Sequence, residues 1–284
     1  MIFSPILGRE LRGRARAQGT YWTRCGIGLT GILICVEGMG LGPVAAPVVA
    51  GPYLFNGIVG AAFLVSCGGC LLTADAISGE RREGTMALLF LTRVKAIDLL
   101  IGKLGSIGIA SLWSLVAFLP VLVVPVLAGG VTGGDAFRKG LALMDTLFFA
   151  LAAGLWSSAG QEERFRASRK AVLVVGLVAI LPIIPFVLMP RVLHGLGLFS
   201  PVILLVLAGD IRYHGSPGLY WISLLLVHAL GWLLLVGAGI RLRRALRTDD
   251  SPIRAPSPKA PKEPERTLGL GSWQPVKEEA SPIE

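Results

Sequence analysis

Three ionisable side chains lie inside apolar segments of this 284-residue sequence: Glu37, Asp145 and His228. Such groups are costly within a lipid bilayer, so they usually face a water-filled cavity or one another and mark a route for ions or other substrates. We therefore take the three as candidate residues of a substrate pathway. The alternative reading leaves Glu37 and Asp145 at the level of the lipid headgroups and has His228 bonded to a neighbouring helix.

A dense run of charge between two apolar stretches forms the second candidate site. It reads ISGERREGTMALLFLTR from Ile77 to Arg93. Its four charged residues at 80–83 are expected in a loop at the membrane surface. Met86, Leu89 and Phe90 recur at helical spacing, and an apolar helix face at a surface needs a partner that covers it. The candidate contact surface consists of Glu80, Arg81, Arg82, Glu83, Gly84, Thr85, Met86, Leu89 and Phe90.

Two other functions are weighed against these sites. Glu162 and Glu163, together with the histidines, suggest a membrane-embedded hydrolase. The pattern of membrane prenyl-protein endopeptidases, however, has an arginine four positions after the second glutamate, where this chain has Ala167. A structural membrane scaffold, with the Pro-rich C-terminal segment as a docking peptide, is the second alternative.

No cofactor and no metal site are expected. Cys67 and Cys70 form a C-x-x-C, but they flank two glycines in an apolar run, where small residues allow close helix packing and two thiols alone are an incomplete metal site. Gly102-Lys103 is not followed by Ser or Thr, and Ile97 stands where a phosphate-binding loop has its first glycine. The chain is therefore not expected to be an enzyme, and ATP hydrolysis would belong to another polypeptide.

The composition places these residues in a polytopic membrane protein. The chain is 53% hydrophobic and only 16% charged, and its mean hydropathy is +0.69, which soluble domains do not reach. A helix needs about 20 apolar residues to cross the hydrocarbon layer. The sequence therefore predicts an all-α fold with six transmembrane helices. They are expected at Cys25–Gly42, Leu54–Thr73, Leu104–Leu127, Leu141–Ala159, Ala171–Met189 and Leu219–Ile240.

The distribution of cations predicts the orientation of these helices. The net charge of +9 would suggest nucleic acid for a soluble protein, but no nucleic-acid partner is expected here because the cations flank the apolar segments. With the N-terminus inside, 23 of the 27 Lys and Arg residues fall in cytoplasmic segments, and only Arg138, Lys139, Arg191 and Arg212 fall outside. Both termini and the loop that contains Ser78 are therefore expected in the cytoplasm, with the chain in the cell (inner) membrane.

Three segments complete the predicted organisation. Residues 1–21 combine apolar residues at helical spacing with arginines, which indicates an interfacial helix ahead of the six-span domain at 22–240. The outer segment Pro190–Gly218 contains an apolar run at 196–208 that is too short to span, so we expect a re-entrant hairpin before the last helix. The basic, Pro-rich tail at 241–284 is expected to be disordered and to lie in the cytoplasm.

This order of elements resembles the membrane (permease) subunit of an ABC transporter of the type 2 exporter superfamily. In that family the second span is followed by a Glu-rich turn, Gly-Thr, a Leu-rich helix and a Gly-Lys pair. The N-terminal connecting helix has a similar counterpart in FSPILGRELRGRAR. The matching residues here are Glu80, Glu83, Gly84, Thr85, Leu88, Leu89, Gly102 and Lys103, and near the N-terminus Pro5, Arg9, Glu10, Leu11 and Arg12.

The resemblance implies a set of partners. The segment after the second span would be a coupling helix seated on a cytoplasmic ABC ATPase subunit. A second permease subunit, identical or different, would complete the translocation pathway within the lipid bilayer. The direction implied is export, whereas no residue pattern in the spans indicates a particular substrate.

Overall fold

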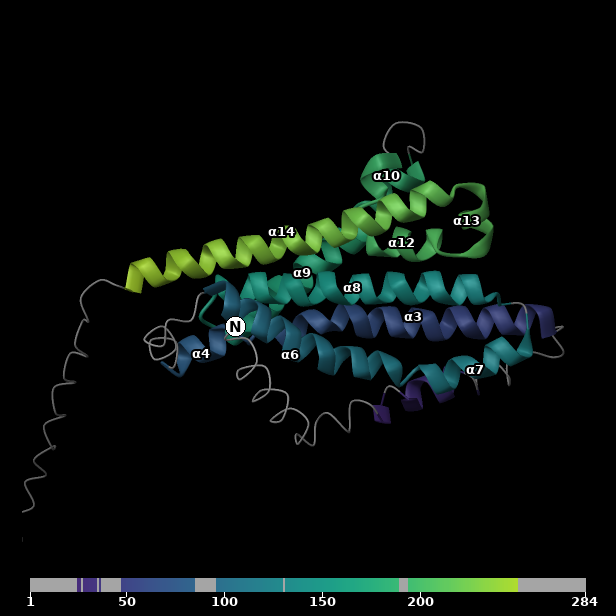
Figure 1. The fold of residues 1–284 in the computed structure, drawn as a ribbon, viewed down its shortest axis with the longest axis horizontal. Helices are drawn as coiled ribbons and strands as arrows, with labels where there is room; N and C mark the ends of the chain where they lie inside the picture. The colour runs from purple at the N-terminus through teal and green to yellow at the C-terminus, as the bar shows by residue number, and fades with distance from the viewer. Residues whose placement is uncertain are drawn as a thin grey trace, which may run out of the picture. The chain divides into compact units, whose positions relative to one another are not determined.

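A computed structural model describes the chain at residues 25–26, 28–34, 36, 47–84, 96–129, 131–188 and 194–249, and every regular element in this described part is a helix. The all-α prediction is therefore confirmed there. The helices are drawn in Figure 1. They are α3 (Pro47–Thr73), α4 (Ser78–Arg82), α6 (Ala96–Val116), α7 (Leu119–Ala128), α8 (Gly133–Ala159), α9 (Arg164–Ile180), α10 (Ile183–Leu188), α11 (His194–Gly197), α12 (Pro201–Leu207), α13 (Asp210–Gly215) and α14 (Pro217–Asp249).

Five helical stretches in the described residues are long and apolar enough to cross a membrane, as a polytopic membrane protein requires. They are Gly51–Arg82, Ile97–Leu127, Gly133–Ala159, Arg164–Pro185 and Pro217–Ala245. Each contains or overlaps one of the predicted spans two to six. The described residues at 25–26, 28–34 and 36 are helical. The rest of the first predicted span, the N-terminal helix and most of the C-terminal tail lie outside the described residues.

Helices α3 and α8 form the centre of this bundle. Of the most apolar stretch of α8, 67% is buried, against 22% to 44% for the other four candidate spans. The two helices approach so closely at Gly154 that a Cβ atom there would overlap the Thr73 hydroxyl and the Cys70 carbonyl. Thr73 Oγ1 donates to the Leu151 carbonyl at 2.9 Å, so the close approach also satisfies a polar group inside the bundle.

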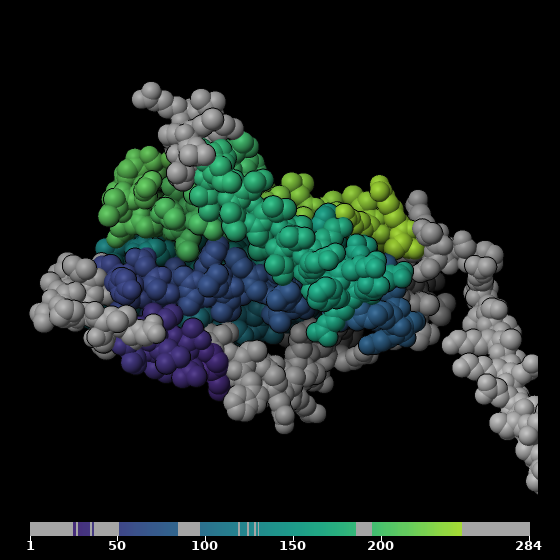
Figure 2. All heavy atoms as spheres, turned by 180° about the vertical axis from the view of Figure 1, so that it is seen from behind, coloured from purple at the N-terminus to yellow at the C-terminus, as the bar shows by residue number. Residues whose placement is uncertain are grey.

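The other helices cover this pair. Helix α9 contacts both α8 and α3, and Figure 2 shows it in teal across the blue atoms of α3. Helix α6 contacts the same pair. Helix α14 packs on α8 through an apolar cluster that includes Leu235, Ala238 and Leu242. Many of the remaining large apolar side chains are exposed, as expected for faces that meet lipid or another subunit.

Two predicted helix boundaries are wrong, each for an identifiable reason. The third span is not one helix: α6 ends at Val116 and α7 begins at Leu119, just before Pro120, which lacks a backbone N–H. Helix α8 begins at Gly133 rather than at Leu141. Thr132 caps it by accepting a hydrogen bond from the Asp135 N–H at 3.0 Å, so the helix includes cations that the sequence assigned to a loop.

The segment between the last two candidate spans forms short helices instead of another span. Helix α12 has seven residues, and its Pro201, Ile203, Leu204 and Leu207 are buried against α8 and α9. Ser200 caps α12, and its hydroxyl also donates to the Ala179 carbonyl at 2.6 Å. In the described part of this segment no helix is long enough to be a candidate span, and the segment is attached to α9 through Ser200. Its re-entrant character stays a prediction.

The close α3–α8 contact predicts a strong effect of a single methyl group. Gly154→Ala should lower the free energy of unfolding by about 1–3 kcal/mol, because the new methyl must displace packed backbone. The matched control is Gly176→Ala on α9, where a Cβ meets nothing within 4 Å. The control should be neutral or stabilising, since Ala is the better helix former. Thermal unfolding of both purified variants tests this, and equal melting temperatures would contradict the packing argument.

The predicted topology can be tested at exposed residues on α13 and next to α4, but not at Ser78. Ser78 is fully buried, so a cysteine there would stay unlabelled whichever side it faced. Exposed Glu83 is the better position, and exposed Arg212 on α13 supplies the opposite end. In a chain without its native cysteines, Glu83→Cys should react with an impermeant reagent only after permeabilisation, and Arg212→Cys should react in intact cells. The reverse pattern would show the opposite orientation.

Candidate functional site

Asp145 and His228, two of the predicted pathway residues, form a hydrogen-bonded pair between α8 and α14. His228 Nδ1 lies 2.8 Å from Asp145 Oδ1. Trp232, one helical turn after His228, donates its indole N–H to His228 Nε2 at 3.0 Å. An indole can only donate, so Nε2 must accept, and the proton of the neutral imidazole lies on Nδ1, from which it is donated to Asp145. These three side chains are called the polar chain below.

An aromatic contact positions this polar chain. The ring of Phe148 stacks on His228 with a centroid distance of 4.8 Å and an angle of 27°. Phe148 lies on the same face of α8 as Asp145, three residues later. On α14, Gly231 makes room for the ring, because a Cβ there would lie 2.5 Å from Phe148 Cε1. The glycine thus lets α14 approach α8 closely enough for the hydrogen bond.

The polar chain runs from the interior of the bundle to its surface. The Asp145 side chain is 6% exposed, whereas that of His228 is 49% exposed. The second carboxylate oxygen, Asp145 Oδ2, is buried and accepts no hydrogen bond from the described residues. Asp145 lies about 18 Å from the start of α8, near the middle of a hydrocarbon layer about 30 Å thick. A buried carboxylate oxygen at that depth attracts a cation or a hydrogen-bond donor.

Glu37, the third predicted pathway residue, lies outside the described residues. Phe148, Gly231 and Trp232, by contrast, belong to the site although the sequence analysis did not select them. The four-residue spacing of His228 and Trp232 is a signal that could have been used, since residues four apart meet on one helix face. The sequence carries no comparable signal for the pairing of His228 with Asp145, because the two residues are 83 positions apart.

A second polar cluster joins the beginning of α8 to α13 and α14. Arg138 is buried, forms an ion pair with Asp210, and donates from Nε to the Ala208 carbonyl at 2.9 Å. Its guanidinium lies 4.0 Å from the ring centre of Tyr213. The hydrogen bond from the Thr132 hydroxyl, at 2.6 Å, and then the charge of Arg138 hold the pKa of Asp210 below its ordinary value. The cluster fixes α13 to the end of the bundle.

Lys139, the neighbouring cation, is buried too and lies in the helix rather than in a loop. Its ammonium group donates to Asn56 of α3 at 2.8 Å and to Asp135 at 3.0 Å. The sequence contained a signal for this arrangement, because Thr132-x-x-Asp135 is a helix-start pattern. Charge alone predicts a loop at Arg138 and Lys139, and that prediction is wrong because both side chains have partners within the bundle.

The charged residues at 80–83 do not form a loop. Residues Ser78–Arg82 form the short helix α4, which follows α3 after one turn at 74–77. Glu83 is its C-cap residue, and Gly84 follows with a φ of +70°, a conformation that glycine adopts without strain. Two hydrogen bonds to the Ser158 hydroxyl, from the Ile77 and Ser78 N–H groups at 3.0 Å each, attach the turn to α8.

Ion pairs connect α4 to two further candidate spans. Glu80 pairs with Lys103 of α6 at 2.6 Å. Asp75, in the turn before α4, pairs with Arg82 at 2.7 Å and with Arg164 of α9 at 3.5 Å. The described part of the candidate contact surface is therefore anchored. Thr85, Met86, Leu89 and Phe90, the other predicted members of that surface, lie outside the described residues.

The residues that suggested a hydrolase do not gather into a site. Exposed Glu163 pairs with Arg166 on its own helix at 2.9 Å. His214 Nδ1 bonds to the Asp210 carbonyl within α13, and His228 belongs to the polar chain. No group of three or more His, Cys, Asp or Glu residues in the described part of the chain is arranged to hold a metal ion.

The comparisons with known proteins identify no family for this chain: no family model matches it, and a search of curated proteins finds no match.

The polar chain predicts opposite effects of two substitutions on stability. His228→Ala leaves both oxygens of buried Asp145 without a donor, and it should lower the free energy of unfolding by about 1–3 kcal/mol. Asp145→Asn keeps an acceptor for His228 and removes a buried charge, so it should be neutral or stabilising. His214→Ala, which removes one exposed bond within α13, is the control and should stay within about 0.5 kcal/mol. Equal melting temperatures for His228→Ala and wild type would mean that the histidine does not hold Asp145.

Proposed function

We propose that this chain is the membrane-spanning permease subunit of an ATP-driven ABC transporter, of the type 2 exporter superfamily, and that it works in export. In this proposal a separate cytoplasmic ATPase hydrolyses ATP. In this proposal the helical residues at 25–26, 28–34 and 36 belong to the first of six spans, and both termini lie in the cytoplasm, as the cation distribution predicts.

The observation that carries the proposal is the attachment of α4 to three spans. The helix follows α3 after a single turn, reaches α6 through Glu80 and Lys103, and is joined to α9 through Asp75 and Arg164. A displacement of α4 would therefore act on three candidate spans together. Transmission of this kind is what a transporter needs at the contact with its ATPase, because ATP is hydrolysed outside the membrane and the substrate moves within it.

The exposed part of α4 has the chemistry of a docking surface. Arg82, Glu83 and Gly84 are exposed, while Ser78 is buried. Opposite charges at the exposed end of a fixed helix, Arg82 and Glu83, suit a partner with complementary charges, since such charges select the partner and its register. The predicted apolar face of Met86, Leu89 and Phe90 would follow directly and would supply the apolar anchor.

The polar chain supports a substrate route within the membrane. Its histidine and tryptophan are about half exposed on the surface of one chain, at mid-bilayer depth. A half-exposed polar group at that depth is expected to meet a second permease subunit or a water-filled pathway and not lipid alone. This exposure fits half of a pathway that a second permease subunit completes.

The test is recovery of the ATPase with a tagged, full-length chain. Glu83→Lys reverses a charge on the exposed end of α4 and should reduce recovery of the ATPase by about tenfold or more, because like charges placed opposite each other are costly. The ATPase is identified in the eluate by peptides that contain a phosphate-binding loop sequence. Phe90→Ala, in the predicted apolar face, should act in the same direction.

Two controls separate docking from general damage. Glu163→Lys reverses an exposed charge in the turn before α9, and Asp145→Asn alters the polar chain in the middle of the bundle. Both should leave recovery of the ATPase unchanged. If Glu83→Lys recovers as much ATPase as wild type, α4 is a linker only. If wild type recovers no ATPase, the scaffold alternative gains support.

A further inference from the structure

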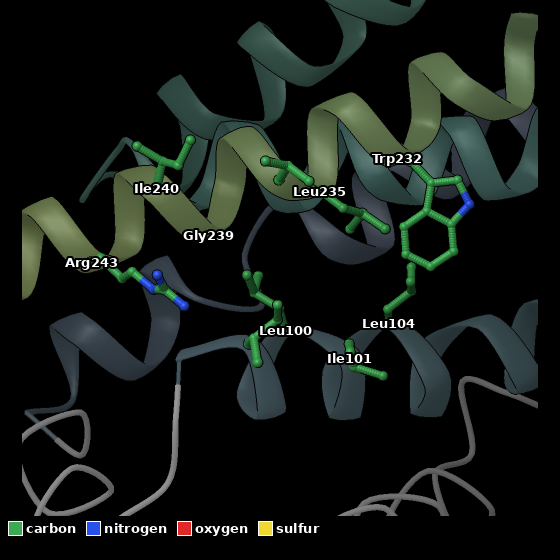
Figure 3. A pocket seen from close by; sticks show the side chains of 10 residues that line it. Leu100, Ile101, Leu104, Trp232, Leu235, Gly239, Ile240 and Arg243 are labelled. Atoms are coloured by element: carbon green, nitrogen blue, oxygen red, sulfur yellow. The ribbon is translucent and has the colours of Figure 1, made fainter.

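An apolar groove of about 280 Å³ lies between α6 and α14. Figure 3 shows Leu100, Ile101 and Leu104 on one wall and Trp232, Leu235 and Ile240 on the other. Both helices belong to the candidate spans, so this groove lies within the bilayer. It is separate from the charged surface of α4, and it meets the polar chain only through the ring of Trp232.

The single charged side chain in the described lining of the groove is Arg243, at one end. It is exposed and forms no ion pair with a described residue. Figure 3 shows its guanidinium directed toward the space between the two helices. A guanidinium binds phosphate oxygens through paired N–H groups, so this end of the groove suits a phosphate.

The groove runs from the hydrocarbon of one lipid leaflet into its headgroup region. Arg243 lies about 39 Å along α14 from Pro217, which puts it beyond a hydrocarbon layer about 30 Å thick and within the headgroup region. Trp232 lies about 16 Å before Arg243 and about 22 Å from Pro217, so it is inside the hydrocarbon layer. The groove is thus apolar at its end within the hydrocarbon and cationic at its end in the headgroup region.

From these observations we infer that the groove binds one anionic phospholipid, with an acyl chain between α6 and α14 and the phosphate at Arg243. The leaflet is the one at the α4 end of the bundle, which is cytoplasmic in the predicted topology. The inference requires that α6 and α14 span a bilayer, and it does not depend on transport or on an ATPase. The apolar lining with one cation at its headgroup end matches an acyl chain that carries a phosphate, so the lipid is the occupant proposed and a second copy of the chain is an outcome of the test.

Native mass spectrometry of the purified full-length chain can test the headgroup contact. The probes are dioleoyl phosphatidylglycerol and dioleoyl phosphatidylcholine, which share acyl chains and differ in net charge. Wild type should bind the anionic lipid more tightly. Arg243→Gln should reduce that affinity about fivefold, because one cation near the surface contributes about that much. It should weaken binding of the zwitterionic lipid less, because the choline cation already offsets the charge of its phosphate. Arg212→Gln on α13 removes an equal charge elsewhere and should change neither affinity.

Filling the groove tests the acyl contact. Val236 lines the groove and is 58% exposed, so Val236→Trp adds bulk there without disturbing a buried core. It should lower the affinity for both lipids about tenfold or more, since each buried methylene contributes to lipid binding. Leu233→Trp is the control, because Leu233 is 67% exposed on the same helix and does not line the groove.

Two results would overturn the inference. An unchanged preference for the anionic lipid in Arg243→Gln would remove the headgroup contact. Unchanged lipid binding in Val236→Trp, together with loss of an oligomer that wild type and Leu233→Trp retain, would assign the groove to a second copy of the chain. Melting temperatures close to wild type for all four variants ensure that a loss of lipid is not a loss of fold.

Discussion

The close packing of α3 on α8 is the constraint on which the rest of the bundle depends. Apolar surface gives helices no net drive to associate in lipid, so the contact must come from tight packing and from hydrogen bonds between helices. Gly154 provides the first, because only a residue without a Cβ fits beside Thr73 and Cys70. Thr73 and Ser158 provide the second, through bonds to the Leu151 carbonyl and to the turn after α3. Once α3 and α8 are joined in this register, each end of α8 is fixed in space.

Helix α8 then carries the polar groups whose placement matters most. Near its beginning Arg138 binds Asp210 and Lys139 binds Asn56, in its middle Asp145 meets His228, and near its end Ser158 binds the turn that leads into α4. Every one of these groups would be costly in lipid if it had no partner. The partners come from α3, α13 and α14, so satisfying the polar groups of one helix also determines which helices surround it.

The sequence predicted the existence of the spans well because that prediction requires only long apolar runs. Five of the six runs appear as candidate spans, and the sixth lies mostly outside the described residues. The predicted helix boundaries are wrong where charged residues were interpreted as the end of a helix. Arg138 lies inside α8 because Asp210 of α13 pairs with it, and Lys139 lies there because it pairs with Asp135 of the same helix and donates to Asn56 of α3. Likewise the charges at 80–83 belong to helix α4, since Lys103 and Ser158 lie close enough to bind it.

The candidate site could be predicted only as a set of separate residues. Asp145 and His228 were selected because each is ionisable within an apolar run, and that criterion uses local sequence alone. Their pairing depends on the approach of α14 to α8, which Gly231 permits by accommodating the Phe148 ring. The role of Trp232 follows from its bond to His228, which the four-residue spacing of the two residues indicates but which an ionisable-residue criterion does not select.

The two sites are connected most directly through α6. Glu80 ties α6 to α4 through Lys103, and Leu100 and Leu104 of α6 line the groove that also contains Trp232. The α3–α8 contact has no free space, whereas α6 and α14 are separated by the groove, so α6 can shift relative to α14 at a lower packing cost. Any such shift changes the space beside the Trp232 ring. A series of contacts therefore leads from the charged surface of α4 through α6 and Trp232 to the hydrogen bond between His228 and Asp145.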